Sequence, residues 1–245
     1  MSATQSDVIA KLQEGTGASL FPMESFQSWL RGESQTLLCF GIPGAGKTVL
    51  AAQVIDALLK DEGYKSSPVL YFFADGRTRQ AEQQSSTSIL AILLKQLILC
   101  NRSVSHETLW FSERRIKGGN RPHAQGLLAC LEHETAKSHK VFVVIDALDE
   151  LSESCRRDIL DYLRKLQEKR TVSLMATSQP TPQTMAIFSA AFPRCRTLYI
   201  HPTQEDMEAY LLGQMTRLPD VVMGRTDIRE YIRSEIMRLS GGQYV

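Results

Sequence analysis

Short apolar runs alternate with longer segments of helical spacing along this chain of 245 residues. Five runs are rich in the branched and aromatic residues typical of strands: residues 35–40, 69–73, 140–146, 172–178 and 198–200. The third is continuously apolar up to a terminal aspartate, which is the composition of a central strand in a parallel sheet covered on both faces. The pattern predicts an α/β fold in which helices cover a five-stranded parallel sheet.

Apolar residues at helical spacing predict the helices between these strands. A short N-terminal helix carries Phe26 and Trp29, which we expect in the core, and ends at Gly32. Further helices are predicted over residues 49–58, 87–99, 125–136, 159–166, a segment that opens at 203, and 228–239. Residues 109–111 are interpreted as a packing anchor, and residues 112–122, rich in charge and glycine, as an exposed loop.

One motif between the first strand and the following helix carries chemistry. Residues 41–48, GIPGAGKT, fit the pattern G-x-x-x-x-G-K-[ST] at every fixed position. Its glycines let the backbone turn tightly, so that N–H groups and the positive end of the next helix converge on phosphate oxygens. Lys47 adds a cation at the β- and γ-phosphates, and Thr48 offers a hydroxyl to Mg²⁺. A glycine-rich turn with a solvated lysine is the alternative. The residues assigned to the nucleotide are Gly41, Ile42, Pro43, Gly44, Ala45, Gly46, Lys47 and Thr48.

Acidic residues end the third strand. Asp146 closes it, and Asp149 and Glu150 follow within a turn. We predict that Asp146 holds Mg²⁺, directly or through a water, and that Glu150 polarises the water attacking the γ-phosphate. Asp149 shares that task or binds the water shell of the metal. Alternatively, both acids cap a helix that begins near Glu153, where negative charge is stabilising.

The fourth strand ends in Thr177 and Ser178. Ser178 is a candidate to read the γ-phosphate, although a simple exit from strand to loop explains it equally well. The phosphate loop follows the first strand, and the acidic segment, a Walker B motif, ends the third. This order is typical of NTPases that insert a strand between the two motif strands and place a catalytic acid after the second motif.

Composition excludes several classes of protein. The chain has 28 basic and 27 acidic residues, so no basic surface argues for nucleic acid as a partner. Its five cysteines are scattered and form no C-x-x-C pair, which speaks against a disulfide framework and a zinc site. We see no export signal and no membrane-spanning segment, and we therefore expect a cytoplasmic protein.

Several of these segments together resemble the NACHT-type signal-transduction NTPases, in particular the nephrocystin-3-like N-terminal modules of fungal receptors. The resemblance rests on residues 15–17, Phe26, Trp29, and segments 40–48, 93–97, 144–150 and 176–180. It implies a switch that binds ATP or GTP with Mg²⁺ and that self-associates or binds protein partners. This family commonly has arginine at position 179, where the chain has Gln179, so a cation near the γ-phosphate is missing and hydrolysis is expected to be slow.

These predictions divide the chain into three parts. Residues 1–32 form a lead-in helix, residues 33–202 a three-layer P-loop NTPase core, and residues 203–245 the helical start of a truncated lid. We expect slow NTP hydrolysis within a regulatory switch. A non-catalytic nucleotide-binding or protein-interaction module is the main alternative. A small-molecule kinase is disfavoured because no arginine-rich lid motif follows the fourth strand. The motif reads only phosphates and metal, so ATP and GTP remain open.

Overall fold

The computed structural model describes residues 21–76, 84–118, 123–201, 208, 211, 215 and 224–240. The resemblance at residues 15–17 and the helix start expected at residue 203 lie outside these ranges, as does most of the segment that precedes the last helix. The fold is therefore established for the central NTPase-like region and for one C-terminal helix.

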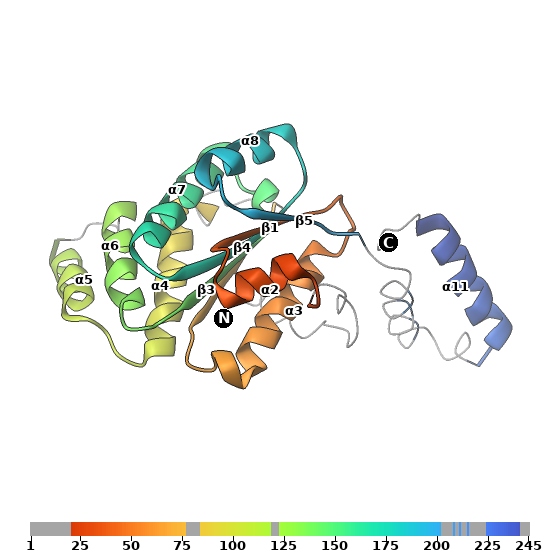
Figure 1. Ribbon diagram of the computed structural model, residues 1–245, viewed down its shortest axis with the longest axis horizontal. Helices are drawn as coiled ribbons and strands as arrows, with labels where there is room; N and C mark the ends of the chain where they lie inside the picture. The colour runs from red at the N-terminus through yellow and green to blue at the C-terminus, as the bar shows by residue number, and fades with distance from the viewer. Residues whose placement is uncertain are drawn as a thin grey trace.

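Five parallel strands form a single sheet (Figure 1). The strands are β1 (Thr36–Phe40), β2 (Val69–Phe73), β3 (Val141–Asp146), β4 (Val172–Ser178) and β5 (Arg196–Tyr199). They lie in the order β2-β3-β4-β1-β5, and each neighbouring pair is parallel. The predicted α/β class with a five-stranded parallel sheet is confirmed. Strand β4 lies between β1 and β3, so the strand that carries the glycine motif and the strand that ends in Asp146 are separated by one strand.

Helices cover both faces of the sheet, which makes three layers (Figure 1). One face packs against α2 (Glu24–Arg31) and α3 (Lys47–Lys60), and the other against α4 (Ser86–Asn101), α6 (Ala124–Thr135), α7 (Glu153–Lys169) and α8 (Pro182–Ala191). Alternate residues of β1 enter opposite cores: Leu38 faces the larger cluster and Leu37 the smaller one. Because both faces are buried, β1, β2, β3 and β4 are mostly apolar, whereas the edge strand β5 is largely exposed.

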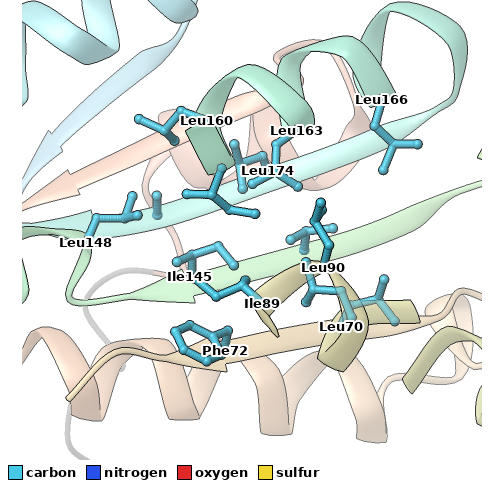
Figure 2. Close-up of a cluster of buried hydrophobic side chains, with 14 of the residues drawn as sticks. Leu70, Phe72, Ile89, Leu90, Ile145, Leu148, Leu160, Leu163, Leu166 and Leu174 are labelled. Atoms are coloured by element: carbon cyan, nitrogen blue, oxygen red, sulfur yellow. The ribbon is translucent and has the colours of Figure 1, made fainter. Parts of the chain in front are cut away.

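In the larger core, residues of β1, β2, β3 and β4 pack against helices that include α4 and α7. Figure 2 shows Leu70 and Phe72 of β2, Ile145 of β3 and Leu174 of β4 meeting leucines and isoleucine of these two helices. On the other face, Trp29 is fully buried and donates from Nε1 to the Leu174 carbonyl at 3.0 Å. The predicted packing role of the aromatic residues in α2 is therefore confirmed.

Two helices differ from the sequence interpretation. Residues 112–118, expected in an exposed loop, belong to helix α5 (His106–Gly118). Ser105 begins this helix, since its hydroxyl accepts a hydrogen bond from the Thr108 amide at 3.2 Å, and the ring of Phe111 packs over Gly126 of α6. The backbone at residues 112–118 is therefore helical rather than a loop. Helix α8 was not predicted at all, although Thr181 caps it and Pro182 is its first residue.

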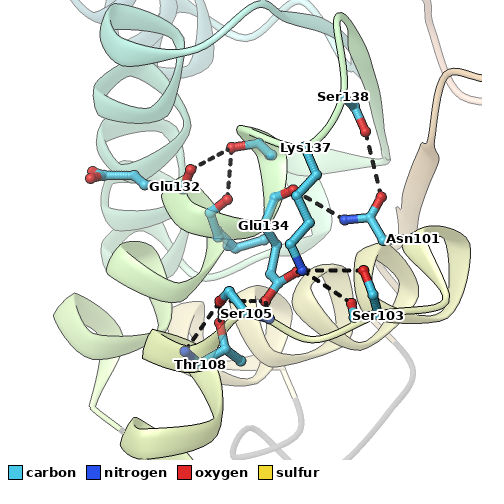
Figure 3. Close-up of polar contacts among 10 residues, drawn as sticks. Asn101, Ser103, Ser105, Thr108, Glu132, Glu134, Lys137 and Ser138 are labelled. Atoms are coloured by element: carbon cyan, nitrogen blue, oxygen red, sulfur yellow. Dashed lines mark hydrogen bonds and ion pairs between the residues drawn. The ribbon is translucent and has the colours of Figure 1, made fainter.

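A polar cluster fixes α6 to the connection between α4 and α5 (Figure 3). Glu134 is fully buried; its Oε1 accepts from the Ser105 amide and hydroxyl at 2.8 Å, and its Oε2 pairs with Lys137 Nζ at 2.7 Å. Burial alone would raise the pKa of Glu134, but the hydrogen bonds from Lys137 and Ser105 outweigh it and lower the pKa to about 2. This carboxylate is a structural element of the fold.

The remaining described elements are short 3₁₀ helices and one C-terminal helix. The 3₁₀ helices are η2 (Glu62–Tyr64) and η4 (Leu148–Glu150). The last helix, α11 (Thr226–Ser240), covers the expected helix at 228–239 and stands apart from the sheet in Figure 1. Within the described ranges, no helix is both long enough and apolar enough to cross a membrane.

Candidate functional site

The glycine motif forms a tight loop at the carboxyl end of β1. Gly44 and Gly46 have φ angles of 74° and 82°, the left-handed region that favours glycine. A Cβ at Gly41 would lie 3.0 Å from the Ala45 Cβ, so that position is closely packed as well. Helix α3 begins directly after its N-cap Gly46, which has no side chain to cap the first N–H groups, and these have no intrahelical acceptors. The loop therefore presents backbone donors at a helix N-terminus.

Lys47 lies folded over this loop. Its Nζ donates to the carbonyl oxygens of Gly41 at 2.8 Å and Ile42 at 3.0 Å. Burial lowers the pKa of Lys47, while the negative charges of Asp149 and Asp146, and more weakly Glu150, oppose that shift. The lysine of the first motif and the acids of the second therefore lie on the same edge of the sheet, within electrostatic reach of one another.

Asp146 is buried at the end of β3 between two hydroxyl groups. Thr177 of β4 donates to Asp146 Oδ1 at 2.5 Å, and the side chain of Thr48 lies near enough to this carboxylate to lower its pKa. Burial raises the pKa of Asp146, and the two threonine hydroxyls and the charge of Lys47 act in the opposite direction. The structure thus brings together Thr48 and Asp146, the two residues that the sequence assigns to a metal ion.

A left-handed residue turns the chain from β3 into the acidic segment. Ala147 has φ 55° and ψ 50°, and its amide donates to the Thr177 hydroxyl at 2.9 Å. The 3₁₀ helix η4 follows immediately and carries Asp149 and Glu150. A non-glycine residue is strained in this region, and here a buried hydrogen bond holds it there. The turn therefore places Asp149 and Glu150 along the carboxyl edge of the sheet.

Asp149 and Glu150 have different partners. Asp149 Oδ1 accepts from the Gln179 amide at 2.9 Å and the Ser178 hydroxyl at 3.2 Å. Glu150 is exposed, and its Oε2 accepts from the Gly76 amide, three residues beyond β2, at 2.6 Å. The structure thus ties Asp149 to the end of β4 and leaves Glu150 open to solvent beside a backbone donor.

Neither acid supplies the hydrogen-bond cap of the following helix. Ser152 caps α7, since its hydroxyl accepts from the Cys155 amide at 3.3 Å. Both carboxylates are directed to other elements instead. A serine immediately before the helix is the better cap because its short side chain reaches back to the third helical amide.

The other predicted site residues also lie at this edge. Ser178 is fully buried, its hydroxyl faces Asp149, and its carbonyl accepts from the Gly41 amide at 3.1 Å. Within the loop, Ile42 and Pro43 are exposed and Ala45 is buried. Sequence reasoning named Thr177 beside Ser178 at the end of the fourth strand but not its contact with Asp146, and it missed Gly76 altogether. Thr177 lies at the carboxyl end of β4, and Gly76 lies three residues beyond β2. A residue at or just beyond the carboxyl end of a parallel strand is a candidate site residue by position alone.

The oxygen donors of this edge fit Mg²⁺ better than a softer metal. Thr48 and Asp146 supply a hydroxyl and a carboxylate, the ligands that Mg²⁺ combines with waters and substrate phosphates. In the ranges that the structure describes, no group of three or more histidine, cysteine or acidic residues is arranged to enclose a metal ion. The residues present suit a cation held jointly by the protein and a phosphate chain.

Comparison with known proteins places this site in a family. The family model described as "Nephrocystin 3, N-terminal" matches residues 15–179, well over half of the chain. The chain belongs to the nephrocystin 3 N-terminal family. The match covers the glycine motif, Asp146 and the acidic turn, and it ends at Gln179. A search of curated proteins gave no match.

Solved structures similar to this nephrocystin 3 N-terminal chain share its fold. The ORC1 protein of Aeropyrum pernix, solved in complex with DNA, is 16% identical with a TM-score of 0.57, and the match covers 88% of this chain and 53% of that one. A Walker-type ATPase of Pyrococcus abyssi is 10% identical with a TM-score of 0.55, covering 96% and 68%. The chain thus spans about half the length of the Aeropyrum protein. At these identities the likeness establishes the P-loop NTPase fold alone.

Proposed function

We propose that this chain is a Mg²⁺-dependent nucleoside triphosphate-binding module with slow hydrolysis, working as a NACHT-type switch. The observation that carries the proposal is the meeting of Lys47 and Thr48 of the glycine motif with Asp146 and the acidic turn at one edge of the sheet. Self-association or protein partners would transmit the state of the switch, whereas nucleic acid is not expected as a partner because the charge is balanced.

Phosphate binding would use groups that lie ready in the loop. The first amides of α3 and the helix dipole favour an anion at this point. Lys47 would leave the carbonyl oxygens of Gly41 and Ile42, which are neutral, and pair with phosphate oxygens, which are charged and therefore form stronger hydrogen bonds. Thr48 and Asp146 would hold Mg²⁺, which supplies positive charge to the phosphates.

Hydrolysis would depend on Glu150 rather than Asp149. Asp149 accepts two hydrogen bonds from the end of β4, so its carboxylate serves as a brace. Glu150 is exposed and has one backbone donor, which leaves acceptor capacity on its carboxylate to orient a water molecule. Gln179 is neutral, so it cannot stabilise the charge on the transferred phosphoryl group as an arginine does, and slow turnover follows.

Nucleotide affinity tests the binding half of the proposal. We expect Lys47→Ala to weaken binding of a fluorescent ATP or GTP analogue at least about tenfold, because a charge-assisted contact to phosphate contributes roughly 1.5–3 kcal/mol. Lys60→Ala, on the exposed end of the same helix, is the matched control. Removal of Mg²⁺ with a chelator is expected to weaken binding of the parent as well. Equal affinity of Lys47→Ala and the control would overturn nucleotide binding at this loop.

Phosphate release separates the switch enzyme from its alternative, a module that binds nucleotide without hydrolysing it. The neutral Gln179 favours that alternative. Slow release that Glu150→Gln abolishes, with affinity retained, supports hydrolysis by the acidic turn. Release that continues unchanged in Glu150→Gln contradicts the role of Glu150, and binding without any release in the parent supports the non-catalytic module.

A further inference from the structure

A buried arginine lies directly behind the acidic turn. Arg156, in the first turn of α7, is only 8% exposed, whereas its neighbour Arg157 projects outward and pairs with Glu153. Guanidinium stays protonated in proteins, so Arg156 brings a full positive charge into the region between η4, α7 and α8. A buried charge is costly unless it has partners, and its partners therefore indicate what it does there.

The partners of Arg156 are three neutral oxygen atoms from two elements. Its Nη2 donates to the carbonyl oxygens of Leu151 at 3.0 Å and Asp149 at 3.2 Å, and its Nη1 donates to the Thr184 hydroxyl of α8 at 2.8 Å. Among the residues that the structure describes, the buried Nε has no hydrogen-bond partner. A guanidinium that bonds to backbone carbonyls on both sides of Glu150 fixes the path of the chain there.

Arg156 joins the acidic turn to α8, and a second contact joins this turn to the β4–α8 connection. The second is the carboxylate of Asp149, which accepts from the Gln179 amide. Arg156 donates hydrogen bonds from α7 to the main chain of the turn, and the carboxylate of Asp149 accepts a hydrogen bond from the β4–α8 connection. Together, these contacts hold the acidic turn to the residues that precede α8 and to the first turn of α8.

We propose that Arg156 is the positioning residue that holds the Asp149–Leu151 backbone so that Glu150 keeps its place for catalysis, and that it couples this turn to α8. The inference rests on the proposed function of Glu150 in hydrolysis. Arg156 does not touch the nucleotide; it acts through the turn. Loss of the contact therefore lowers the rate of the chemical step and leaves nucleotide affinity nearly unchanged, since the phosphate loop has no contact with Arg156 in the described structure.

Three variants test this role. Arg156→Met removes the charge and all three hydrogen bonds but keeps much of the volume, Arg156→Lys keeps the charge without the planar fork, and Arg157→Met is the exposed control on the same helix. We expect kcat for phosphate release to fall about 10- to 100-fold in Arg156→Met, because small misplacement of a catalytic group costs that much. Arg156→Lys should recover part of the rate, and nucleotide Kd should change less than about threefold in all three variants, since none removes a contact to phosphate.

A second readout does not depend on hydrolysis. The amides of Gly76 and Gln179 donate to Glu150 and Asp149, so their hydrogen exchange, measured by NMR, reports whether the turn is in place. Arg156→Met should speed exchange at both amides at least about tenfold relative to Arg157→Met, while the amide of Leu174 in the sheet keeps its protection. If Arg156→Met does not fold, Arg156→Lys and Thr184→Val carry the test, with smaller changes in the same direction.

The results separate the two proposals. A parent protein that binds nucleotide but never releases phosphate overturns hydrolysis, and amide exchange then decides the role of Arg156 alone. A kcat in Arg156→Met equal to that of Arg157→Met, or exchange at Gly76 and Gln179 that does not change, overturns the positioning role. A loss of affinity as large as the loss of rate points to general damage of the site and also overturns it.

Discussion

At the scale of single residues, surroundings rather than residue type separate the three acids of the site. Asp146 is buried between threonine hydroxyls, Asp149 is bound to the end of β4, and Glu150 is exposed beside one amide. A carboxylate whose lone pairs are already occupied is fixed in position, whereas one with free capacity can bind a water. The division into metal ligand, brace and candidate base follows from these contacts.

Thr177 tests how much the buried hydroxyl between β3 and β4 contributes. Thr177→Val keeps the shape but removes the donor to Asp146 and the acceptor of the Ala147 amide. We expect it to lower the free energy of unfolding by about 2–3 kcal/mol in urea denaturation, because two buried polar groups lose their partner. Thr177→Ser, which keeps the hydroxyl, is the control. Equal stability of the two variants would contradict this account.

The sequence specifies some of these residues and not others. Lys47, Thr48 and Asp146 were predictable because the motif fixes residue type, spacing and position after a strand. Thr177 and Gly76 reach their carboxylate partners across 31 and 74 positions in the chain. Such contacts depend on the order of the strands in the sheet, which local patterns do not encode. The role of Arg156 could not be predicted from the sequence either, since two adjacent arginines are typical of a solvent-exposed helix face.

At the scale of elements, the sequence interpretation failed where packing between helices determines the secondary structure. The central strands were predicted closely because burial on both faces makes them mostly apolar, with polar residues at their carboxyl ends. The sequence of helix α5 carries several charges and was therefore interpreted as a loop, whereas its packing against α6 cannot be seen in the local sequence pattern. That contact depends on Gly126, where a Cβ would lie 2.2 Å from Phe111 Cε2 and 2.3 Å from Cζ.

Gly126→Ala therefore sets two effects against each other. Alanine favours a helix by up to about 1 kcal/mol over glycine, but the overlap with Phe111 forces helices apart at a cost of about 1–3 kcal/mol. We expect Tm to fall in Gly126→Ala. In a Phe111→Leu background, where the ring is absent, the same substitution is expected to cost less, because only the close approach to His123 Cε1 at 2.8 Å remains. A double-mutant cycle by thermal denaturation measures both effects, and an equal fall in Tm in the two backgrounds would contradict the clash with Phe111.

At the scale of the whole molecule, the site and the polar cluster around Glu134 serve different ends. The site occupies the carboxyl edge of the sheet, whereas the Glu134 cluster joins α6 to the α4–α5 connection in the layer that covers one face (Figures 1 and 3). Catalytic acids need free acceptor capacity, but the carboxylate of Glu134 is bound by Ser105 and Lys137. Its charge therefore contributes to folding stability and makes that stability depend on pH.

The pKa of Glu134, about 2 in the folded protein against an ordinary value of 4.5, sets the direction of this dependence. Because the pKa is lowered, the contribution of Glu134 to the free energy of unfolding is complete above about pH 4.5 and is lost as the pH falls towards 2. The loss is up to about 1.4 kcal/mol per pH unit and about 3 kcal/mol in all. We expect Glu134→Gln to be less stable than the parent at pH 7, and the difference in free energy of unfolding to shrink in urea titrations between pH 5 and pH 3. Glu132→Gln, which removes a carboxylate paired with exposed Lys169, is the control and should cost about 1 kcal/mol or less. A difference between the parent and Glu134→Gln that stays constant over this pH range would contradict the assignment, because an uncharged role for Glu134 predicts no change with proton concentration.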